Sequence, residues 1–140
     1  MNKGLIVHTL ISNSSGEVLI LHRSMQEDVL PDFWDIPGGT LEDGEDPAEG
    51  AVRETKEETG IEISNPRLFF CRSKIDVEKN KQFVTLIFWA RYANQEIILN
   101  HKEHQEYAWI KLSDISRYKT VEYLKDCLAA FQEQFGNYNK

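Results

Sequence analysis

The chain has 140 residues, of which 41% are hydrophobic and 11% aromatic; this is enough for one core and gives no sign of a second domain. Its formal net charge of -7 argues against nonspecific binding to a nucleic-acid backbone, which requires clustered Lys and Arg. The apolar run 5–11 is interrupted by His8 and is too short to cross a membrane. We therefore expect one cytoplasmic domain over residues 1–140, with neither a nucleic-acid polymer nor a membrane as partner.

Strand and turn signals alternate in the first part of the chain. Residues 4–12 and 18–22 are apolar, β-branched runs separated by the turn sequence Asn13-Ser14-Ser15-Gly16, a pattern typical of a β-hairpin. Residues 34–36 are short, aromatic and strand-like. The dipeptide Gly38-Gly39 follows and predicts a tight turn free of side chains.

A helix is predicted next because both of its ends carry specific signals. Asp46 can cap the N-terminus, and Pro47 fits the first turn. Gly60 stands where a left-handed residue commonly ends a helix. The sequence therefore predicts a helix from Pro47 up to Gly60.

The rest of the chain predicts several strands and a closing helix. The run 82–92 has the strongest strand pattern and is expected to lie centrally in the sheet. The other predicted elements are strands over 61–63, 68–73, 95–99 and 107–112 and a helix over 121–135. Strands flank the central helix and a helix closes the chain, so we expect a mixed α/β (α+β) single domain.

Three carboxylates share one face of the predicted helix. Glu54, Glu57 and Glu58 stand at positions i, i+3 and i+4, and such an oxygen-rich set is the kind that Mg²⁺ or Mn²⁺ prefers. Most acidic clusters, however, are solvated surface faces. Like charges at these spacings cost only about 0.2–0.5 kcal/mol per pair in water, so the helix alone leaves both interpretations open.

The residues around this helix add a longer pattern. Gly39 is followed after five residues by Glu45, and after seven more by the run Arg53-Glu-Thr-Lys-Glu-Glu-Thr-Gly-Ile61. This spacing matches the Nudix box, here residues 39–61, at every fixed polar and glycine position, a match with chance odds on the order of 10⁻⁹. The sequence therefore resembles the Nudix (MutT-like) hydrolases, which implies an α/β/α sandwich with a mixed central sheet. Thr55 departs mildly, because the family usually has an aliphatic residue there.

The resemblance implies a metal-dependent reaction in which water attacks a phosphorus of a nucleoside diphosphate linked to another group. The groups implied to hold one or more Mg²⁺ or Mn²⁺ ions are the carboxylates of Glu54, Glu57 and Glu58 and the backbone carbonyl of Gly39. Arg53 is implied to pair with these carboxylates and hold them in place. Glu45 is implied to be either a supporting metal ligand or a partner of Arg53.

The general base and the substrate contacts are less defined, because the family does not place them at fixed positions. Glu103 and then Glu106 are the first candidates for the base, followed by Glu54. His101 and His104, in the same predicted loop, could also accept a proton near neutral pH. For substrate contact, Arg23 is the candidate for the phosphates, and Gly38 and Gly39 allow close backbone approach. The candidates for base stacking are Phe33, Trp34 and Phe83. Core packing is the commoner role of such aromatic residues.

Residues outside the box bear on the substrate. ADP-ribose hydrolases tend to carry a proline at a position where this chain has Val77-Glu78, and the tyrosine typical of dinucleoside polyphosphate hydrolases is also missing there. The stretch 34–39 is similar to MutT-type nucleoside triphosphate pyrophosphatases and favours a (d)NTP or oxidised dGTP. The alternatives are a hydrolase of nucleotide sugars or dinucleoside polyphosphates, a non-catalytic nucleotide-binding regulatory module, and an isomerase of a diphosphate. Either a monomer or a homodimer is expected.

Overall fold

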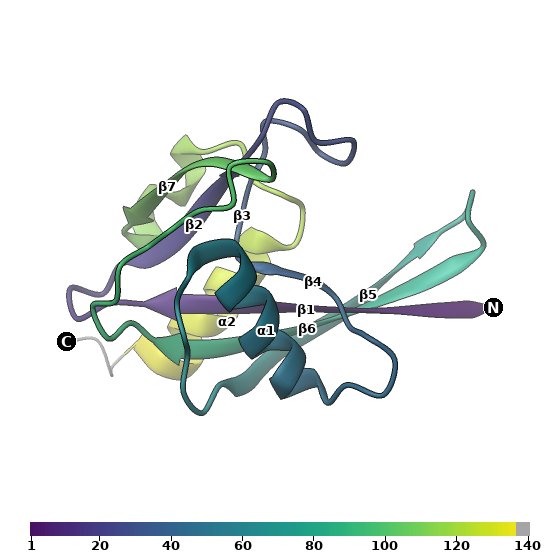
Figure 1. Ribbon diagram of the computed structural model, residues 1–140, viewed down its shortest axis with the longest axis horizontal. Helices are drawn as coiled ribbons and strands as arrows, with labels where there is room; N and C mark the ends of the chain where they lie inside the picture. The colour runs from purple at the N-terminus through teal and green to yellow at the C-terminus, as the bar shows by residue number, and fades with distance from the viewer. Residues whose placement is uncertain (137–140) are drawn as a thin grey trace.

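A computed structural model describes residues 1–136, so the last four residues of the expected domain, 137–140, lie outside the described residues. Within the described part, seven strands form one mixed sheet with helices on its two faces (Figure 1). The elements are β1 (Asn2–Ser12), β2 (Val18–Arg23), β3 (Trp34–Asp35), β4 (Gly38–Thr40), α1 (Pro47–Thr59), β5 (Arg67–Asp76), β6 (Lys81–Arg91), β7 (His104–Ile110), a 3₁₀ helix (Leu112–Arg117) and α2 (Leu124–Phe135).

The sheet has the order β3-β2-β1-β6-β5, with β4 paired to β1 and β7 paired to β2. Its middle is the parallel pair β1 and β6, which runs in register from Asn2 opposite Lys81 to Ser12 opposite Arg91. The other strand pairs are antiparallel. The prediction that 82–92 is an interior strand of a mixed sheet is therefore confirmed, although β1 rather than β6 holds the middle position.

The two faces of the sheet are covered by different helices. Along β6, Phe88 packs with Val7 of β1 and Ala51 of α1, whereas Trp89 packs with Phe131 of α2. Successive side chains of a strand point to opposite faces, so α1 and α2 lie on opposite sides of the sheet (Figure 1). This is the expected α/β/α arrangement. Within residues 1–136 no helix has the length and apolar content needed to cross a membrane.

Two predictions for the N-terminal part are wrong in their details. The strands β1 and β2 meet only at Ser12 opposite Val18, and β2 then pairs along its length with β7, so the hairpin opens directly after its turn. Gly38-Gly39 is not a tight turn but the start of β4, paired to β1 at His8 and Val7. A Cβ atom on Gly38 would lie 2.3 Å from the carbonyl oxygen of Val7, so glycine is required here for close strand approach.

The strands predicted over 61–63 and 95–99 are also absent from the structure. Both segments are irregular, and their apolar side chains pack in one cluster that includes Ile61, Ile63 and Ile97. The backbone N–H of Ile98 donates to the carbonyl of Thr59 at 2.8 Å. The second segment therefore binds the C-terminal end of α1 instead of a strand edge.

Candidate active site

Helix α1 is held in place by the signals that its sequence carries. The Asp46 side chain accepts a hydrogen bond from the N–H of Ala48 at 3.1 Å, and Gly60 ends the helix with φ of 77°. Ala51 and Thr55 are fully buried. Thr55 does not bond a preceding carbonyl; its hydroxyl has no hydrogen-bond partner among the described residues, while Thr59 donates to the Thr55 carbonyl at 2.7 Å.

The three box carboxylates lie in a gradient from buried to exposed. The side chain of Glu58 is 6% exposed, that of Glu54 is 14% exposed and that of Glu57 is 56% exposed. Glu58 Oε2 accepts a hydrogen bond from the backbone N–H of Gly38 at 2.8 Å. The Glu54 carboxylate lies against Gly39, where a Cβ atom would stand 2.7 Å from it. The helix therefore aims Glu54 and Glu58 at strand β4, whereas Glu57 points to solvent.

Arg53 connects the carboxylates around it. Its Nε and one terminal nitrogen donate to the two oxygens of Glu45 at 2.7 and 2.9 Å. The other terminal nitrogen donates to Glu54 at 3.0 Å and to Glu57 at 3.3 Å. The guanidinium and a backbone N–H lower the pKa of Glu45 to about 2. Both oxygens of Glu45 are thus engaged, which favours its role as a partner of Arg53 over that of a metal ligand.

Glu58 faces a second buried titratable group, His104. The distance from Glu58 Oε1 to His104 Nδ1 is 3.6 Å. Burial is the largest cause that raises the pKa of Glu58, to about 9, and burial likewise lowers the pKa of His104 to about 4. His104 Nδ1 has no hydrogen-bond partner among residues 1–136. The expectation that His104 lies in a loop is wrong, because β7 begins at this residue, whose side chain is buried.

The structure separates the two later base candidates. Glu103 places a carboxylate oxygen in a group with ligand atoms of Glu58 and His104, all within 4.8 Å of one another. Burial, followed by the charge of Glu27, raises the pKa of Glu103. Glu106 instead pairs with His22 across β2 and β7, with 3.7 Å between its carboxylate and His22 Nδ1. Of the two, Glu103 is the one placed beside a box carboxylate.

Arg23 lies close to Glu103 but is tied to its own loop. Its Nε donates to the carbonyl of Val29 at 3.0 Å, and a terminal nitrogen is 3.5 Å from Glu27. The next backbone N–H, that of Ser24, donates to the carbonyl of Glu103 at 2.8 Å. The positive charge of Arg23 acts to lower the pKa of Glu103, so this cation is positioned beside the candidate base.

The three aromatic candidates have different surroundings. Trp34 is buried and stacks on His22 with ring centroids 4.5 Å apart. Phe33 packs against the core, and the ammonium of Lys119 lies 4.5 Å from its ring centroid. Only Phe83 of the three lines a cavity of about 500 Å³. Core packing therefore accounts for Trp34 and Phe33, whereas Phe83 lies in the cavity wall with the Lys81 ammonium 5.2 Å from its ring centroid.

The donor set at the carboxylate face of α1 is of the kind that a divalent cation binds. Glu54, Glu57, Glu58 and Glu103 offer carboxylate oxygens, the ligand type that Mg²⁺ and Mn²⁺ prefer. Mutual repulsion between Glu54, Glu58 and Glu103 raises the pKa of Glu58 beyond the effect of burial. A cation bound here would offset that repulsion and compensate the buried charge. The residues present therefore fit a divalent cation, with His104 as a buried neighbour whose Nδ1 lacks a partner.

Replacing Gly39 with alanine should impair this arrangement without unfolding the protein. The added Cβ would lie 2.7 Å from the Glu54 carboxylate, a side chain that can move away. We expect about a tenfold fall in kcat/KM, equal to about 1.4 kcal/mol, with a small change in melting temperature. The comparison variant is Gly38→Ala, whose Cβ would meet backbone at 2.3 Å and should lower stability strongly. Full activity in Gly39→Ala would contradict the placement of Glu54.

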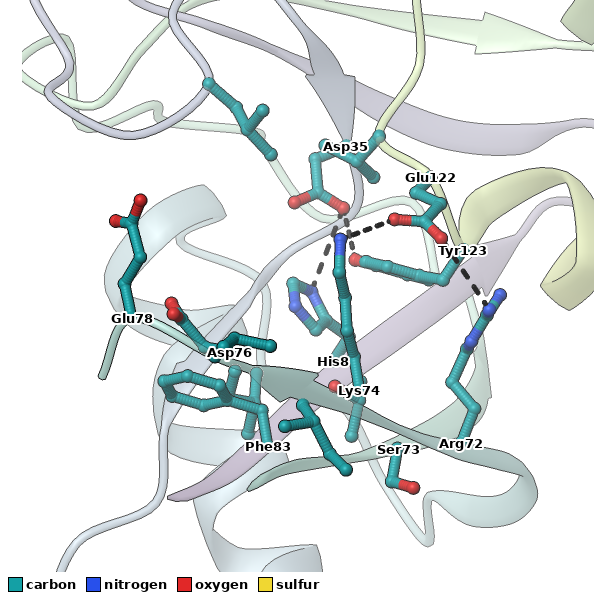
Figure 2. Close-up of a pocket in the computed structure, with 16 residues that line it drawn as sticks. His8, Asp35, Arg72, Ser73, Lys74, Asp76, Glu78, Phe83, Glu122 and Tyr123 are labelled. Carbon is teal, nitrogen blue, oxygen red and sulfur yellow. Dashed lines mark hydrogen bonds and ion pairs between the residues drawn. The ribbon is translucent and has the colours of Figure 1, made fainter. Parts of the chain in front are cut away.

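The sequence pattern did not indicate three polar residues, His8, Asp35 and Tyr123, that lie at one end of the cavity lined by Phe83. Figure 2 shows that His8, Asp35 and Tyr123 converge there, from β1, β3 and the segment before α2. Asp35 is only 6% exposed. The resemblance of the stretch 34–39 to MutT-type enzymes was the only signal near it, and nothing in the sequence pattern links these three positions.

The comparisons with known proteins agree on one family. Residues 3–131 match the family model described as NUDIX domain. The nucleoside triphosphatase NudI of Escherichia coli strain K12 is 34% identical, and the match covers 84% of this chain and 89% of that protein.

Solved structures show the same fold. The MutT protein from Methanosarcina mazei Go1 aligns with a TM-score of 0.81 at 30% identity, covering 99% of this chain and 96% of that one. The NUDIX domain of Shewanella oneidensis NrtR, solved in complex with ADP ribose, aligns with a TM-score of 0.80 at 16% identity, covering 96% and 89%. The chain therefore belongs to the Nudix family and is a hydrolase of diphosphate (acid anhydride) bonds.

Proposed function

We propose that this protein is a metal-dependent pyrophosphatase of nucleoside triphosphates that acts at the carboxylate face of α1. The observation that carries the proposal is the buried Glu58 carboxylate, which shares a site with Glu103 and His104 and is not paired to a cation among the described residues. A buried carboxylate is unfavourable unless a positive charge compensates it. The name of the 34% identical relative, nucleoside triphosphatase, supports the substrate class.

We assign the cation, Mg²⁺ or Mn²⁺, to the carboxylates of Glu54, Glu57 and Glu58, with the Gly39 carbonyl as a further oxygen donor. When bound, such a cation offsets charge on phosphate oxygens and lowers the pKa of water. Arg53 is assigned to positioning, because its guanidinium bonds both Glu54 and Glu57.

The residue assigned to accept the proton from the attacking water is Glu103. Its carboxylate pKa is raised by burial, which moves it toward the range in which a general base is efficient at neutral pH. Glu106 and then Glu54 remain second and third candidates for this role. Arg23, beside Glu103, is assigned to phosphate contact, where a guanidinium can make bidentate hydrogen bonds. Within the class, a (d)NTP or oxidised dGTP is favoured over nucleotide sugars and dinucleoside polyphosphates.

A product assay over nucleotides tests the proposal. Nucleoside triphosphates, oxidised dGTP, nucleotide sugars, ADP-ribose and dinucleoside polyphosphates are each incubated with Mg²⁺ or Mn²⁺, and the released pyrophosphate, phosphate and nucleotide are measured. We expect a triphosphate to yield the monophosphate and pyrophosphate, with no turnover in EDTA. Turnover of only a non-triphosphate would overturn the substrate class, and turnover undiminished by EDTA would overturn the metal dependence.

Replacing Glu57 with glutamine should lower kcat about 10²-fold, or about 2.7 kcal/mol of transition-state stabilisation. The reason is that Glu57 is the most exposed of the assigned carboxylates and bonds Arg53 only at 3.3–3.4 Å, so its oxygens are accessible to a cation. The matched control is Glu49→Gln, the same substitution in the first turn of α1, which should keep its activity. A fully active Glu57→Gln would show that the metal assignment is wrong. Parallel kcat measurements on Glu103→Gln and Glu106→Gln separate the two base candidates.

A further inference from the structure

The structure contains a cavity of about 500 Å³, a size within the range of small-molecule sites. Its walls come from β1, from β3, from the β5–β6 hairpin, and from the segment that precedes α2 (Figure 2). Apolar side chains form much of the wall, among them Ile6, Phe83 and Val121. Three polar side chains, His8, Asp35 and Tyr123, meet at one end, and charged side chains of the β5–β6 hairpin and Glu122 line other parts of the wall. An apolar wall with this polar end suits a flat ligand with a polar edge.

The cavity adjoins the proposed cation site through strand β4. A Cβ atom on Gly38 would lie 2.4 Å from Nδ1 of His8, so the His8 ring packs directly on this glycine. The backbone N–H of the same glycine donates to Glu58 at 2.8 Å. One extended molecule could therefore reach both the carboxylate face of α1 and the cavity.

The charges around the cavity argue against phosphate binding inside it. Its two basic side chains are already paired: Lys74 Nζ lies 2.7 Å from Glu122, and Arg72 lies 3.0 Å from Asp126. Four acidic side chains line the cavity, namely Asp35, Asp76, Glu78 and Glu122. An uncharged part of a nucleotide is therefore the better occupant, and the phosphates belong on the other side of β4.

Asp35 has one oxygen that is engaged and one that is free. Oδ1 accepts a hydrogen bond from the N–H of Ile36 at 2.7 Å and another from the hydroxyl of Tyr123. Burial raises the pKa of Tyr123 well above its ordinary value, so this hydroxyl stays protonated and donates. Oδ2 of Asp35 accepts no hydrogen bond from residues 1–136. The carboxylate thus presents a fixed, unused acceptor at the polar end of the cavity.

The Nδ1 atom of His8 offers no hydrogen-bond donor to a ligand at the polar end of the cavity. That nitrogen lies 2.9 Å from the carbonyl oxygen of Ile36, and because a carbonyl can only accept, Nδ1 carries the proton and gives it to Ile36. In the neutral ring Nε2 is then an acceptor. Asp35 Oδ2 and His8 Nε2 are both acceptors, so a ligand edge that bonds them must carry N–H donors. A ligand atom with a lone pair in that position would face the Asp35 carboxylate without a hydrogen bond.

We infer that this cavity binds the base of the nucleotide, and that Asp35 selects bases that carry a ring N–H over bases that do not. The inference rests on the proposed function and extends it to the substrate's base. Guanine and hypoxanthine carry an N1–H, and uracil and thymine an N3–H. Adenine and cytosine have a lone pair at the equivalent ring nitrogen, which would face a buried carboxylate without a hydrogen bond. Oxidised guanine retains N1–H and belongs to the accepted class.

The test compares kcat/KM for GTP, ITP and UTP with that for ATP and CTP. In the wild-type protein we expect the first group to be favoured by about 10- to 100-fold, because a site built for an N–H rejects analogues without it. ITP matters because it keeps N1–H and lacks the 2-amino group of guanine. In Asp35→Asn the amide oxygen can still accept from Ile36 and Tyr123, so the amide nitrogen must take the Oδ2 position and present a donor. The preference should then fall at least tenfold or reverse.

Asp114→Asn is the matched control, since this aspartate lies in the 3₁₀ helix and pairs with Arg117 outside the cavity. Its base preference should equal that of the wild type. Equal kcat/KM for both groups of bases, or an unchanged preference in Asp35→Asn, would overturn the inference while the proposed triphosphatase activity stands.

Binding of products tests the base preference independently of turnover. Calorimetric titration with GMP and with AMP in EDTA requires no bound cation and no hydrolysis. We expect GMP to bind the wild type at least tenfold more tightly than AMP, and Asp35→Asn to lose that difference. If no triphosphate were hydrolysed but this pattern were seen, the proposed function would fail and the base site would stand. Equal affinities for GMP and AMP would overturn the base site.

Discussion

Replacing Glu58 with glutamine should abolish most activity and, at the same time, stabilise the metal-free protein. Loss of a buried charged ligand is expected to lower kcat about 10³-fold, or about 4 kcal/mol. Glutamine keeps an oxygen that can accept the N–H of Gly38, now 2.8 Å from the carboxylate, so the contact with β4 is retained. The opposite effects on activity and stability arise from one cause, the burial of an ionisable carboxyl group whose charge is compensated only when a cation is bound.

The stability gain should depend on pH in a defined direction. In the folded metal-free protein the pKa of Glu58 is raised from 4.5 to about 9, so the folded state holds a proton that the unfolded state releases. Wild-type stability is therefore unaffected by this group below pH 4.5, falls as the pH rises from 4.5 to 9, and is constant again above 9. Each pH unit within that window corresponds to about 1.4 kcal/mol. At pH 7 the Glu58→Gln protein should be more stable by up to about 3 kcal/mol.

Urea unfolding in EDTA at pH 5, 7 and 8.5 measures this difference. The gap between Glu58→Gln and wild type should widen with pH, and Mg²⁺ should raise the stability of the wild type much more than that of the variant. Glu57→Gln serves as the comparison, because Glu57 is largely exposed and its replacement should leave stability nearly unchanged. A Glu58→Gln protein less stable than the wild type at pH 8.5 would show that the buried carboxylate is not unfavourable.

The parts of the fold that sequence could predict are those determined locally. The ends of α1 depend on Asp46, Pro47 and Gly60, each acting within a few residues, and the helix is found at the predicted place. The spacing from Gly39 to Arg53 likewise identified the family. Local chemistry of this kind does not depend on where the rest of the chain goes.

The wrong predictions concern segments whose conformation depends on distant partners. Gly38 is extended because β1 lies close enough to exclude a Cβ atom, a contact across about thirty positions that a glycine pair does not reveal. The run 95–99 has strand composition, but Ile98 bonds the end of α1. β-Propensity describes a half-buried extended surface rather than a ladder partner, so composition alone could not tell these outcomes apart.

The candidate site shows the same limit. The i, i+3, i+4 spacing placed three carboxylates on one helix face, but it did not predict any difference in burial between Glu58 and Glu57. In the structure the side chain of Glu58 is buried and that of Glu57 is exposed. The buried Glu58 contacts His104 of β7 and Gly38 of β4. Asp35 is held by the N–H of its neighbour Ile36 and by the hydroxyl of Tyr123, which lies far along the chain. Such pairings arise only when the sheet and the C-terminal segment are assembled.

Replacing Phe131 with alanine should have the largest effect on stability and leave the chemistry intact. Phe131 is fully buried, and its ring centroid lies 5.9 Å from that of Phe69 and 5.6 Å from that of Trp89. Removing such a ring from a packed core costs about 3–5 kcal/mol, against a total stability of about 5–15 kcal/mol for a domain.

Because α2 and α1 cover opposite faces of the sheet, the site on α1 should keep its geometry in the Phe131→Ala protein that remains folded. We expect the urea midpoint to fall sharply with an unchanged m value, while kcat at low temperature stays within about twofold of wild type, a difference of about 0.4 kcal/mol. Phe131→Leu should lower the free energy of unfolding less than Phe131→Ala does, since it leaves a smaller cavity. Glu133 lies on the exposed side of α2, so Glu133→Ala should change the free energy of unfolding by no more than about 0.5 kcal/mol. A loss below about 1 kcal/mol in Phe131→Ala would mean that this aromatic cluster does not hold α2 to the sheet.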